Sequence, residues 1–357
     1  MKRVIVAMSG GVDSSVSAAL LKKAGFDVTG MFIKCWDAAD PLGENCTSSD
    51  DERMARLAAA QIGIPFYSIN FVKEYKQKVV EYLLDGYKKG ITPNPDVMCN
   101  KEIKFGLFFD KAMELGADFV ATGHYARVQK SANNSRSRII STKLLMGKDK
   151  NKDQSYFLSF IKPEVLEHVL FPIGEYTKQE VRALAKKFDL PNADRKSSQG
   201  ICFIGKVDFA EFLKQYISPE RGKIADMQGN TLGEHEGAWY YTIGQRSGLG
   251  LAGGPYFVVD KDVKKNIVVV SKNERDLEKN EVLLQDMNWF VDCLRFDFKQ
   301  QITTKLRYRQ TSTSARIKKG NKKEVVLRFD IPQRAVTPGQ LGVLYSGDQM
   351  LGAGVIQ

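Results

Sequence analysis

Residues 4–15 read VIVAMSGGVDSS, a short apolar run followed by a turn rich in glycine and serine. The run 4–8 is typical of a buried strand, and the residues that follow the turn have the apolar spacing of a helix. A glycine-rich turn between a strand and a helix gathers backbone N–H groups and the positive end of the helix dipole at one point. We therefore expect residues 9–15 to hold a phosphate chain.

The composition of this turn narrows the kind of nucleotide site. It lacks the GxxxxGK[ST] pattern of a Walker loop and the GxGxxG pattern of a dinucleotide fold, so it favours neither a kinase nor a dehydrogenase. A plain strand-to-helix turn would need one or two glycines, but not the added serines and Asp13.

The pattern of residues 4–15 continues along the first third of the chain, where β-branched runs alternate with amphipathic stretches. This alternation predicts an α/β domain with a doubly wound parallel sheet and helices on both faces. We expect strands at residues 4–8, 28–33, 65–70 and 119–122. We expect helices at residues 14–24, 50–62, 72–89, 101–115 and 178–188, with Gly25, Gly63 and Gly116 as helix stops.

The rest of the chain lacks this alternation of strand-like and helix-like stretches. Residues 128–155 lose periodicity and gain Asn, Ser, Arg and Lys, which predicts a flexible excursion within the first domain. Residues 197–205 read as a loop that leads into a strand. Short strands follow from residue 222 onward, as at residues 237–245, 256–260 and 267–270. We expect a catalytic domain at residues 1–208, a small central β-rich domain at 209–276 and a C-terminal β-barrel at 277–357.

The net charge of +11 favours polyanionic partners. Seven basic residues and one acid lie in residues 130–152, and eight basic residues and no acid lie in residues 305–323. Two solvated loops would also explain these stretches. A hydrophobic share of 43% is ordinary for a globular chain, and no apolar run approaches the ~20 residues that span a bilayer, so we expect no membrane partner.

The five cysteines lie far apart without a CxxC pair, and the chain has only three histidines. This spacing does not suggest a disulfide framework, and it argues against a protein-bound zinc site. The apolar run after Met1 is too short for a signal-peptide core. We therefore expect a reducing, cytoplasmic location and no metal site formed by a protein motif.

Seven stretches carry a resemblance to one family. SGGVDSS at residues 9–15 resembles the pyrophosphatase loop of enzymes that cleave ATP between the α and β phosphates and pass AMP to a substrate oxygen. Together with six further stretches in the same order, it resembles the bacterial tRNA-specific 2-thiouridylases nearly end to end. The six are NPDVMCNKEIKF (94–105), ATGHY (121–125), KDQSYF (152–157), GICFIG (200–205), YTIGQR (241–246) and RYRQ (307–310).

The resemblance implies roles for individual residues. ATP would be held by Ala7, Met8, Ser9, Gly10, Gly11, Val12, Asp13, Ser14, Ser15, Ile33 and Gly123, with Mg²⁺ near the catalytic Asp13. The flipped target base would be bound by Asn94, Pro95 and Asp96, because a uridine must leave its stack to meet the α-phosphate. Contacts to tRNA are implied for His124, Lys152, Asp153, Gln154, Arg307, Tyr308 and Gln340. His124 by itself also fits a hydrogen-bonded histidine at a strand end.

Two cysteines are expected to be catalytic. Cys99 lies between a Pro-stiffened loop and a helix expected to begin near Asn100, where N–H groups and the helix dipole would favour a thiolate. The resemblance makes Cys202 the carrier of a persulfide. For the other three, Cys35, Cys46 and Cys293, we expect ordinary buried or inert thiols.

The implied reaction is 2-thiolation of the wobble uridine of tRNA. The uridine 2-oxygen attacks the α-phosphate of ATP, and sulfur from the persulfide then displaces AMP. A disulfide between Cys99 and Cys202 remains, which a reductant must reopen. The expected partners are tRNA and a sulfur-relay protein or cysteine desulfurase as sulfur donor.

Two other interpretations fit part of the sequence. An amide or argininosuccinate-type ligase with the same loop would need neither catalytic cysteine. An RNA-binding module with a disused nucleotide loop would release no pyrophosphate from ATP.

Overall fold

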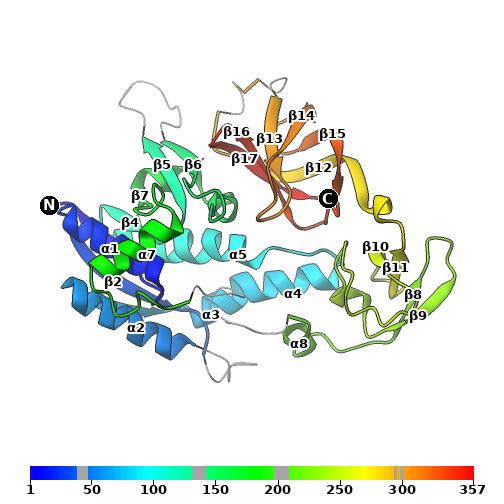
Figure 1. The fold of residues 1–357 in the computed structure, drawn as a ribbon, viewed down its shortest axis with the longest axis horizontal. Coiled ribbons are helices and arrows are strands. Elements are labelled where there is room, and N and C mark those ends of the chain that lie inside the picture. Colours follow the sequence, from blue (N-terminus) through cyan, green and yellow to red (C-terminus); the bar gives the residue numbers. More distant parts are fainter. Residues whose placement is uncertain (38–46, 131–141, 197–208, 293–295, 298–300) are drawn as a thin grey trace.

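The chain begins with a five-stranded parallel sheet, drawn in blue to green in Figure 1. The computed structural model describes residues 1–37, 47–130, 142–196, 209–292, 296–297 and 301–357. The strand order is β3-β2-β1-β4-β7. The strands are β1 (Arg3–Ala7), β2 (Asp27–Lys34), β3 (Phe66–Asn70), β4 (Phe119–Ala121) and β7 (Val169–Leu170). Four of them confirm the expected strands, whereas β7 was not expected, because two residues are too short to show a pattern.

Helices cover both faces of this sheet, which confirms the doubly wound α/β fold. One face packs against α1 (Val12–Lys23) and α2 (Ser48–Ile62) through small side chains such as Ala18, Ala55 and Ala58. The other face packs against the two helical stretches 72–88 and 95–114. The helix α7 (Lys178–Lys187) lies against α1 and begins with a capping box between Thr177 and Glu180.

The two long helical stretches on the second face each contain a π-type segment. The first comprises α3 (Val72–Tyr75), the π-type segment Lys76–Val80 and α4 (Glu81–Lys88). The second comprises α5 (Pro95–Met98), the π-type segment Cys99–Leu107 and α6 (Phe108–Glu114). This second helix was expected to begin near residue 101, and that start is wrong. Asn94 caps it by accepting a hydrogen bond from the Val97 N–H at 3.1 Å, and Pro95 occupies the first turn.

The expected flexible excursion at residues 128–155 is wrong for the residues that the structure describes there. β5 (Ala126–Lys130) and β6 (Thr142–Met146) form an antiparallel pair, and β6 joins the C-terminal sheet at β17. The side chains of Leu144 and Met146 are buried in a cluster that includes C-terminal residues. Contacts with a distant part of the chain thus order two strands whose own five-residue patterns are weak.

A second sheet of four strands follows, in the order β10-β11-β8-β9. It contains β8 (Gly222–Ala225), β9 (Thr231–His235), β10 (Phe257–Asp262) and β11 (Ile267–Ser271), and α8 (Phe209–Lys214) precedes it. The strands near 256–260 and 267–270 are confirmed. The strand expected at residues 237–245 is wrong, because Gly237 and Gly244 have positive φ angles of 145° and 85° and turn the chain.

The C-terminal residues form the expected barrel. Its strands are β12 (Glu278–Trp289), β13 (Gln301–Lys305), β14 (Thr313–Gly320), β15 (Val325–Arg334), β16 (Leu341–Ser346) and β17 (Gln349–Ile356). The order β12-β15-β14-β13-β16-β17 is closed by pairing between β12 and β17. Short 3-10 turns occupy Ser155–Leu158, Pro163–His168, Ala238–Tyr240 and Glu274–Leu277.

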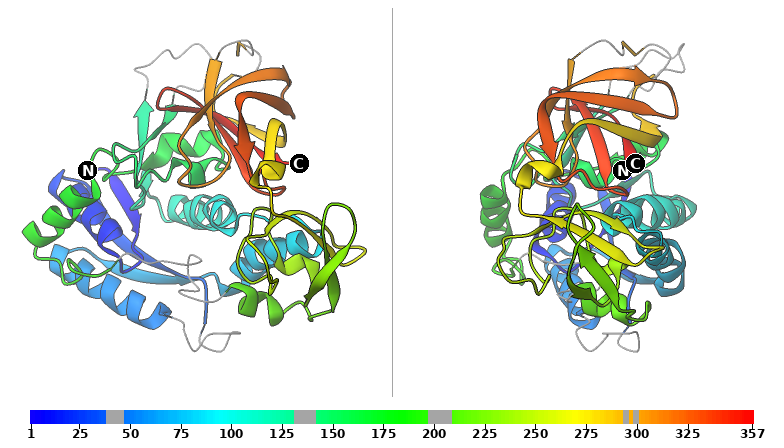
Figure 2. Two further views of the ribbon diagram at one scale, coloured as in Figure 1. Left: turned by 45° about the vertical axis from the view of Figure 1, so that its right-hand side comes forward. Right: turned by 90° about the vertical axis from the view of Figure 1, so that its right-hand side faces the viewer.

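The barrel lies above the helices α3 to α6 in both views of Figure 2, and the central sheet lies beside their far end. Three regions of the chain therefore meet near the end of α4 and the start of α5. None of the helices in the described ranges is long and apolar enough to cross a membrane.

Candidate functional site

The turn between β1 and α1 is shaped by its own side chains. Gly10 has a φ of 75°, and Gly11 is the N-cap of α1. The Ser14 hydroxyl accepts a hydrogen bond from the Ser9 N–H at 3.2 Å and donates one to the Gly11 carbonyl at 3.1 Å. The N–H groups in the first turn of a helix have no intrahelical partners. The turn can therefore offer them to an anion, as the sequence predicts.

Residues far along the chain hold this turn in place. Asn192 donates hydrogen bonds to the Gly10 carbonyl and to the Ser15 hydroxyl, both at 2.9 Å. Arg195 donates to the same Gly10 carbonyl at 3.1 Å and forms an ion pair with Asp51 of α2. The sequence offers no local signal for Asn192 or Arg195, because they are brought to the turn by the tertiary fold.

The neighbouring strand end leaves no room for a side chain. A Cβ atom on Gly123 would lie 2.6 Å from the Ser14 nitrogen and 2.8 Å from the Asp13 carbonyl carbon. Ile33, the other predicted adenosine contact, is buried at the end of β2, where it pairs with Ile69 of β3. The turn follows β1, which lies between β2 and β4, so the strand order reverses at this point. In open α/β sheets this is the place where ligands bind.

One carboxylate oxygen of Asp13 already takes part in a hydrogen bond and an ion pair. Its Oδ1 atom accepts a hydrogen bond from the Tyr125 hydroxyl at 2.8 Å and forms an ion pair with the Lys178 ammonium at 2.5 Å. Burial, followed by the charge of Asp13, raises the pKa of Tyr125 above its usual value. The hydroxyl of Tyr125 therefore stays protonated and keeps donating to Asp13.

Cys99 lies in a different environment from the one expected. Because the helix begins at Pro95, Cys99 lies one turn inside it and not in front of it, which corrects the expected position of the thiol relative to the helix dipole. It is 1% exposed and belongs to an apolar cluster with Ile33, Trp36 and Phe212. Cys202, Cys46 and Cys293 lie outside the described residues, whereas Cys35 is buried as expected.

The three residues predicted to bind the target base lie where the three regions of the chain meet. Gln340 of the barrel donates to the Thr92 carbonyl at 2.8 Å, and Asn94 donates to the Gln340 side chain at 3.4 Å. The Thr92 N–H donates to the Pro338 carbonyl at 2.8 Å, and its hydroxyl lies 3.4 Å from that of Thr242. Pro95 and Asp96 follow in the first turn of α5. The structure thus brings predicted base-binding and tRNA-binding residues together.

Some of the predicted tRNA contacts are packed inside the protein. His124 is 8% exposed, and its Nδ1 atom lies 2.7 Å from the Thr122 hydroxyl. Burial and the nearby charge of Lys104 hold the pKa of His124 well below its ordinary value. Gln154 exchanges hydrogen bonds with the backbone of Tyr125.

Asp153 is a second internal residue of this set. It accepts hydrogen bonds from the N–H groups of Gly147 and Ser155 and pairs with Lys305 of the barrel at 2.9 Å. This ion pair joins the first domain to the barrel.

The remaining candidates lie nearer the surface. Arg307 is exposed, and Lys152 and Tyr308 are half-buried. The ring of Tyr308 lies 4.2 Å from that of Phe157, with Arg309 over its face. Aromatic rings flanked by arginine are suited to stacking with bases.

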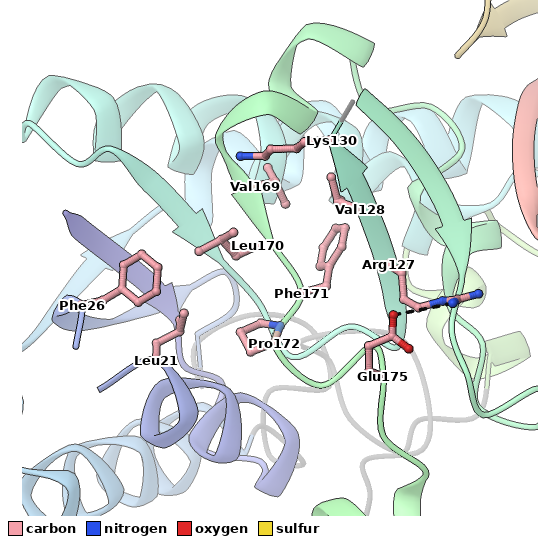
Figure 3. A pocket seen from close by; sticks show the side chains of 10 residues that line it. All are labelled: Leu21, Phe26, Arg127, Val128, Lys130, Val169, Leu170, Phe171, Pro172 and Glu175. Carbon is pink, nitrogen blue, oxygen red and sulfur yellow. Dashed lines mark ion pairs between the residues drawn. The ribbon is translucent and has the colours of Figure 1, made fainter. Parts of the chain in front are cut away.

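A cavity of about 440 Å³ lies elsewhere in the first domain (Figure 3). Its walls include Leu21, which is in the last turn of α1, and the ion pair between Arg127 and Glu175 at 3.6 Å. The turn at residues 9–15 is at the opposite end of α1, so this cavity is separate from the predicted nucleotide site. Within the described ranges, no group of three or more His, Cys, Asp or Glu side chains is placed to hold a metal ion.

Three family models match the chain in succession. They are described as the tRNA methyl transferase HUP domain at residues 2–206, the tRNA methyl transferase PRC-barrel domain at 210–272 and the aminomethyltransferase beta-barrel domain at 279–356. Their descriptions name methyl transfer, whereas the curated relatives that match over the full length are named as thiouridylases. The full-length matches are the more specific finding.

Those relatives cover nearly the whole chain. The tRNA-specific 2-thiouridylase MnmA of Streptococcus mutans is 48% identical over 362 residues, which is 99% of this chain and 95% of that protein. The protein of the same name from Lactiplantibacillus plantarum is 49% identical over 363 residues, with the same coverage. That from Bacillus pumilus is 47% identical over 359 residues, with 99% and 94% covered.

Two solved structures resemble just over half of the chain. An NMN synthetase from Francisella tularensis has a TM-score of 0.33 and 18% identity, covering 55% of this chain and 66% of that one. A 4-thiouridine synthetase in complex with RNA and ATP has a TM-score of 0.33 and 16% identity, covering 57% and 45%. Likeness at this level carries no conclusion about ligands.

Proposed function

This chain belongs to the tRNA-specific 2-thiouridylase family, and we propose on that ground that it replaces the 2-oxygen of the wobble uridine in tRNA with sulfur. The observation that supports it best is the geometry of residues 9–15 at the reversal point of the parallel sheet. It can hold the phosphates of ATP while the adenosine lies near Ile33 and Gly123. Gly123 fits this role because a side chain there would collide with the Ser14 backbone.

The residues present also fit a magnesium ion bound together with ATP. Mg²⁺ is commonly held by one or two carboxylates plus substrate phosphates, and it would neutralise charge on the phosphates. Asp13 supplies one carboxylate at the turn, and its Oδ2 atom forms no hydrogen bond with the described residues. Asp13 is therefore our proposed magnesium ligand, while its Oδ1 atom is held by Tyr125 and Lys178.

Asn94, Pro95 and Asp96 are proposed to form the pocket for the flipped uridine. Their loop is fixed from two sides, by Gln340 of the barrel and by Thr242 of the central domain. Binding tRNA to the barrel and the first domain together would thus place the anticodon loop against a loop that is already held in position. Arg307 offers an exposed charge for the RNA, and the half-buried Lys152 and Tyr308 offer a second charge and an aromatic ring.

The sulfur step is assigned to Cys202 and Cys99. A sulfur-relay protein or cysteine desulfurase delivers sulfane sulfur to Cys202. That sulfur displaces AMP from the activated uridine, or Cys99 releases it as sulfide, and the two thiols end as a disulfide. The site must open for this step, because the Cys99 side chain is buried among apolar residues. Since the disulfide must be reduced after each turnover, a reducing cytoplasm suits the cycle.

The test is direct measurement of the product. The protein is incubated with unmodified tRNA, ATP, Mg²⁺ and a persulfide donor, and the digested nucleosides are weighed by mass spectrometry. We expect 2-thiouridine from the wild type and none from Asp13→Ala or from a reaction without ATP. Pyrophosphate release without any 2-thiouridine would contradict the proposal and favour a ligase that uses the same turn.

A further inference from the structure

Lys178 is a positively charged side chain held at the nucleotide turn without an assigned task. It lies 165 positions from Asp13 in the sequence, yet its ammonium is 2.5 Å from the Asp13 carboxylate. Its side chain is 14% exposed, so the charge is largely shielded from water. Lys178 is not part of any motif by which the sequence resembles the thiouridylases.

The fold fixes Lys178 at this point through two helices. Lys178 is the first residue of α7, and its backbone N–H donates to the Asp149 carboxylate at 2.9 Å. Val12 in the first turn of α1 and Val181 in the first turn of α7 belong to one buried cluster. This shared cluster packs α7 against α1, and the first residue of α7 reaches Asp13 in the first turn of α1.

The other positively charged side chain at the turn, Arg195, already has partners within the protein. Among the described residues, the basic side chains that form a hydrogen bond or an ion pair with residues 9–15 are Arg195 and Lys178. The Arg195 guanidinium is shared between the Gly10 carbonyl and the Asp51 carboxylate of α2. The Lys178 ammonium has three N–H donors and donates one hydrogen bond to Asp13, which leaves two donors for other acceptors.

We propose that Lys178 binds the pyrophosphate that leaves ATP, with Asp13 holding its ammonium in position. The inference rests on the proposed ATP-dependent reaction. When the bond between the α-phosphorus and the bridging oxygen breaks, its electron pair stays on that oxygen, and the uridine 2-oxygen becomes bonded to the α-phosphorus. Negative charge therefore grows on the β-phosphate, and a fixed ammonium stabilises it without any proton transfer.

A purely structural ion pair between Lys178 and Asp13 would behave differently. Such a pair would stabilise the packing of α1 on α7, and its loss would lower the melting temperature while leaving anion affinity unchanged. A phosphate-binding lysine changes the affinity for pyrophosphate itself. The two roles are therefore separated by an equilibrium binding measurement on folded protein.

The experiment titrates the full-length protein with inorganic pyrophosphate and Mg²⁺ in a calorimeter, with no RNA present. We expect Lys178→Gln to bind pyrophosphate at least about tenfold more weakly, since a charge-assisted hydrogen bond is lost. Lys178→Arg, which keeps the charge, should recover much of the affinity. The matched control is Lys187→Gln in the exposed last turn of the same helix, which should bind as the wild type does. A Kd for Lys178→Gln within twofold of wild type overturns the inference.

A measurement on the wild type covers the case in which Lys178→Gln does not fold. Lysines are methylated with and without pyrophosphate and Mg²⁺, and the rate at each site is followed by mass spectrometry. Pyrophosphate should slow the modification of Lys178 and leave that of Lys187 unchanged, and an unchanged rate at Lys178 refutes the role.

Failure of this inference can be told apart from failure of the proposed function. If the wild type makes 2-thiouridine while Lys178→Gln binds pyrophosphate normally, only the role of Lys178 is wrong. If the wild type makes no 2-thiouridine but Lys178→Gln still loses pyrophosphate affinity, Lys178 serves a different ATP-cleaving reaction.

Discussion

Replacing Asp153 with alanine should destabilise the joint between the first domain and the barrel. The Asp153 side chain is 1% exposed and that of Lys305 is 12% exposed, so the ion pair between them is buried. The variant would leave the Lys305 ammonium without its carboxylate, and the N–H groups of Gly147 and Ser155 would lose their acceptor. Removing one member of a buried pair costs about 3–5 kcal/mol. For a chain of this size we expect the melting temperature to fall by about 5–10 °C.

Thermal unfolding followed by circular dichroism measures this loss. The matched control is Asp330→Ala, which removes an exposed partner of Arg316 and should change stability by less than about 1 kcal/mol. The double variant Asp153→Ala/Lys305→Met should recover part of the loss, because no unpaired ammonium stays buried. If Asp153→Ala melts as the wild type does but binds tRNA more weakly, Asp153 contacts RNA as the sequence predicts, and the structural explanation is wrong.

Three further predictions concern the packing of Gly123 against the turn at residues 9–15, the cysteines Cys99 and Cys202, and the pH dependence of stability. Gly123→Ala should lower tRNA-dependent pyrophosphate release by about a hundredfold, because its Cβ would press on the Ser14 nitrogen at 2.6 Å; unchanged release by the folded variant would contradict this. Cys202→Ser should still release pyrophosphate but form no 2-thiouridine, whereas Cys99→Ser should accept one sulfur on Cys202, seen by mass, and fail to turn over. Repeated turnover by both variants would exclude the thiolation mechanism. Burial lowers the pKa of Lys261 to about 8, so protonation is unfavourable in the folded state relative to the unfolded chain. Stability should therefore rise with pH from about 8 toward the unfolded pKa of about 10.4, and Lys261→Met should remove that rise in a series of melting curves; an identical pH profile would show that Lys261 is not the cause.

Local sequence was sufficient for the elements whose pattern is long or chemically distinct. The apolar run at residues 4–8 followed by glycines predicted β1 and the turn, because a buried parallel strand must be apolar on both faces. The glycines at 25, 63 and 116 end helices with positive φ angles, as expected from residues without a Cβ atom. The same logic missed the capping role of Asn94, although an Asn followed by Pro is itself a helix-start signal.

Reading the residues themselves, apart from the family resemblance, reached only the parts of the candidate site that are adjacent in sequence. The turn at residues 9–15 and the pair Asn94 and Pro95 are local motifs, so their chemistry can be read directly. Asp153 shows the limit of such reading, since an acidic residue in a basic stretch looks like a surface group until its buried lysine partner is known.

The sequence by itself determined the class of sheet, the glycine-rich turn proposed to bind phosphate and the family to which the chain belongs, because each depends on residues that are neighbours along the chain. Only the tertiary structure decided which distant side chains complete the site. Lys178 and Asn192 reach the turn from more than 160 positions away, and Gln340 reaches the Thr92 carbonyl across 248 positions. Contacts of that separation depend on how the helices and the barrel pack, and packing is a property of the whole buried core and not of any short stretch of sequence.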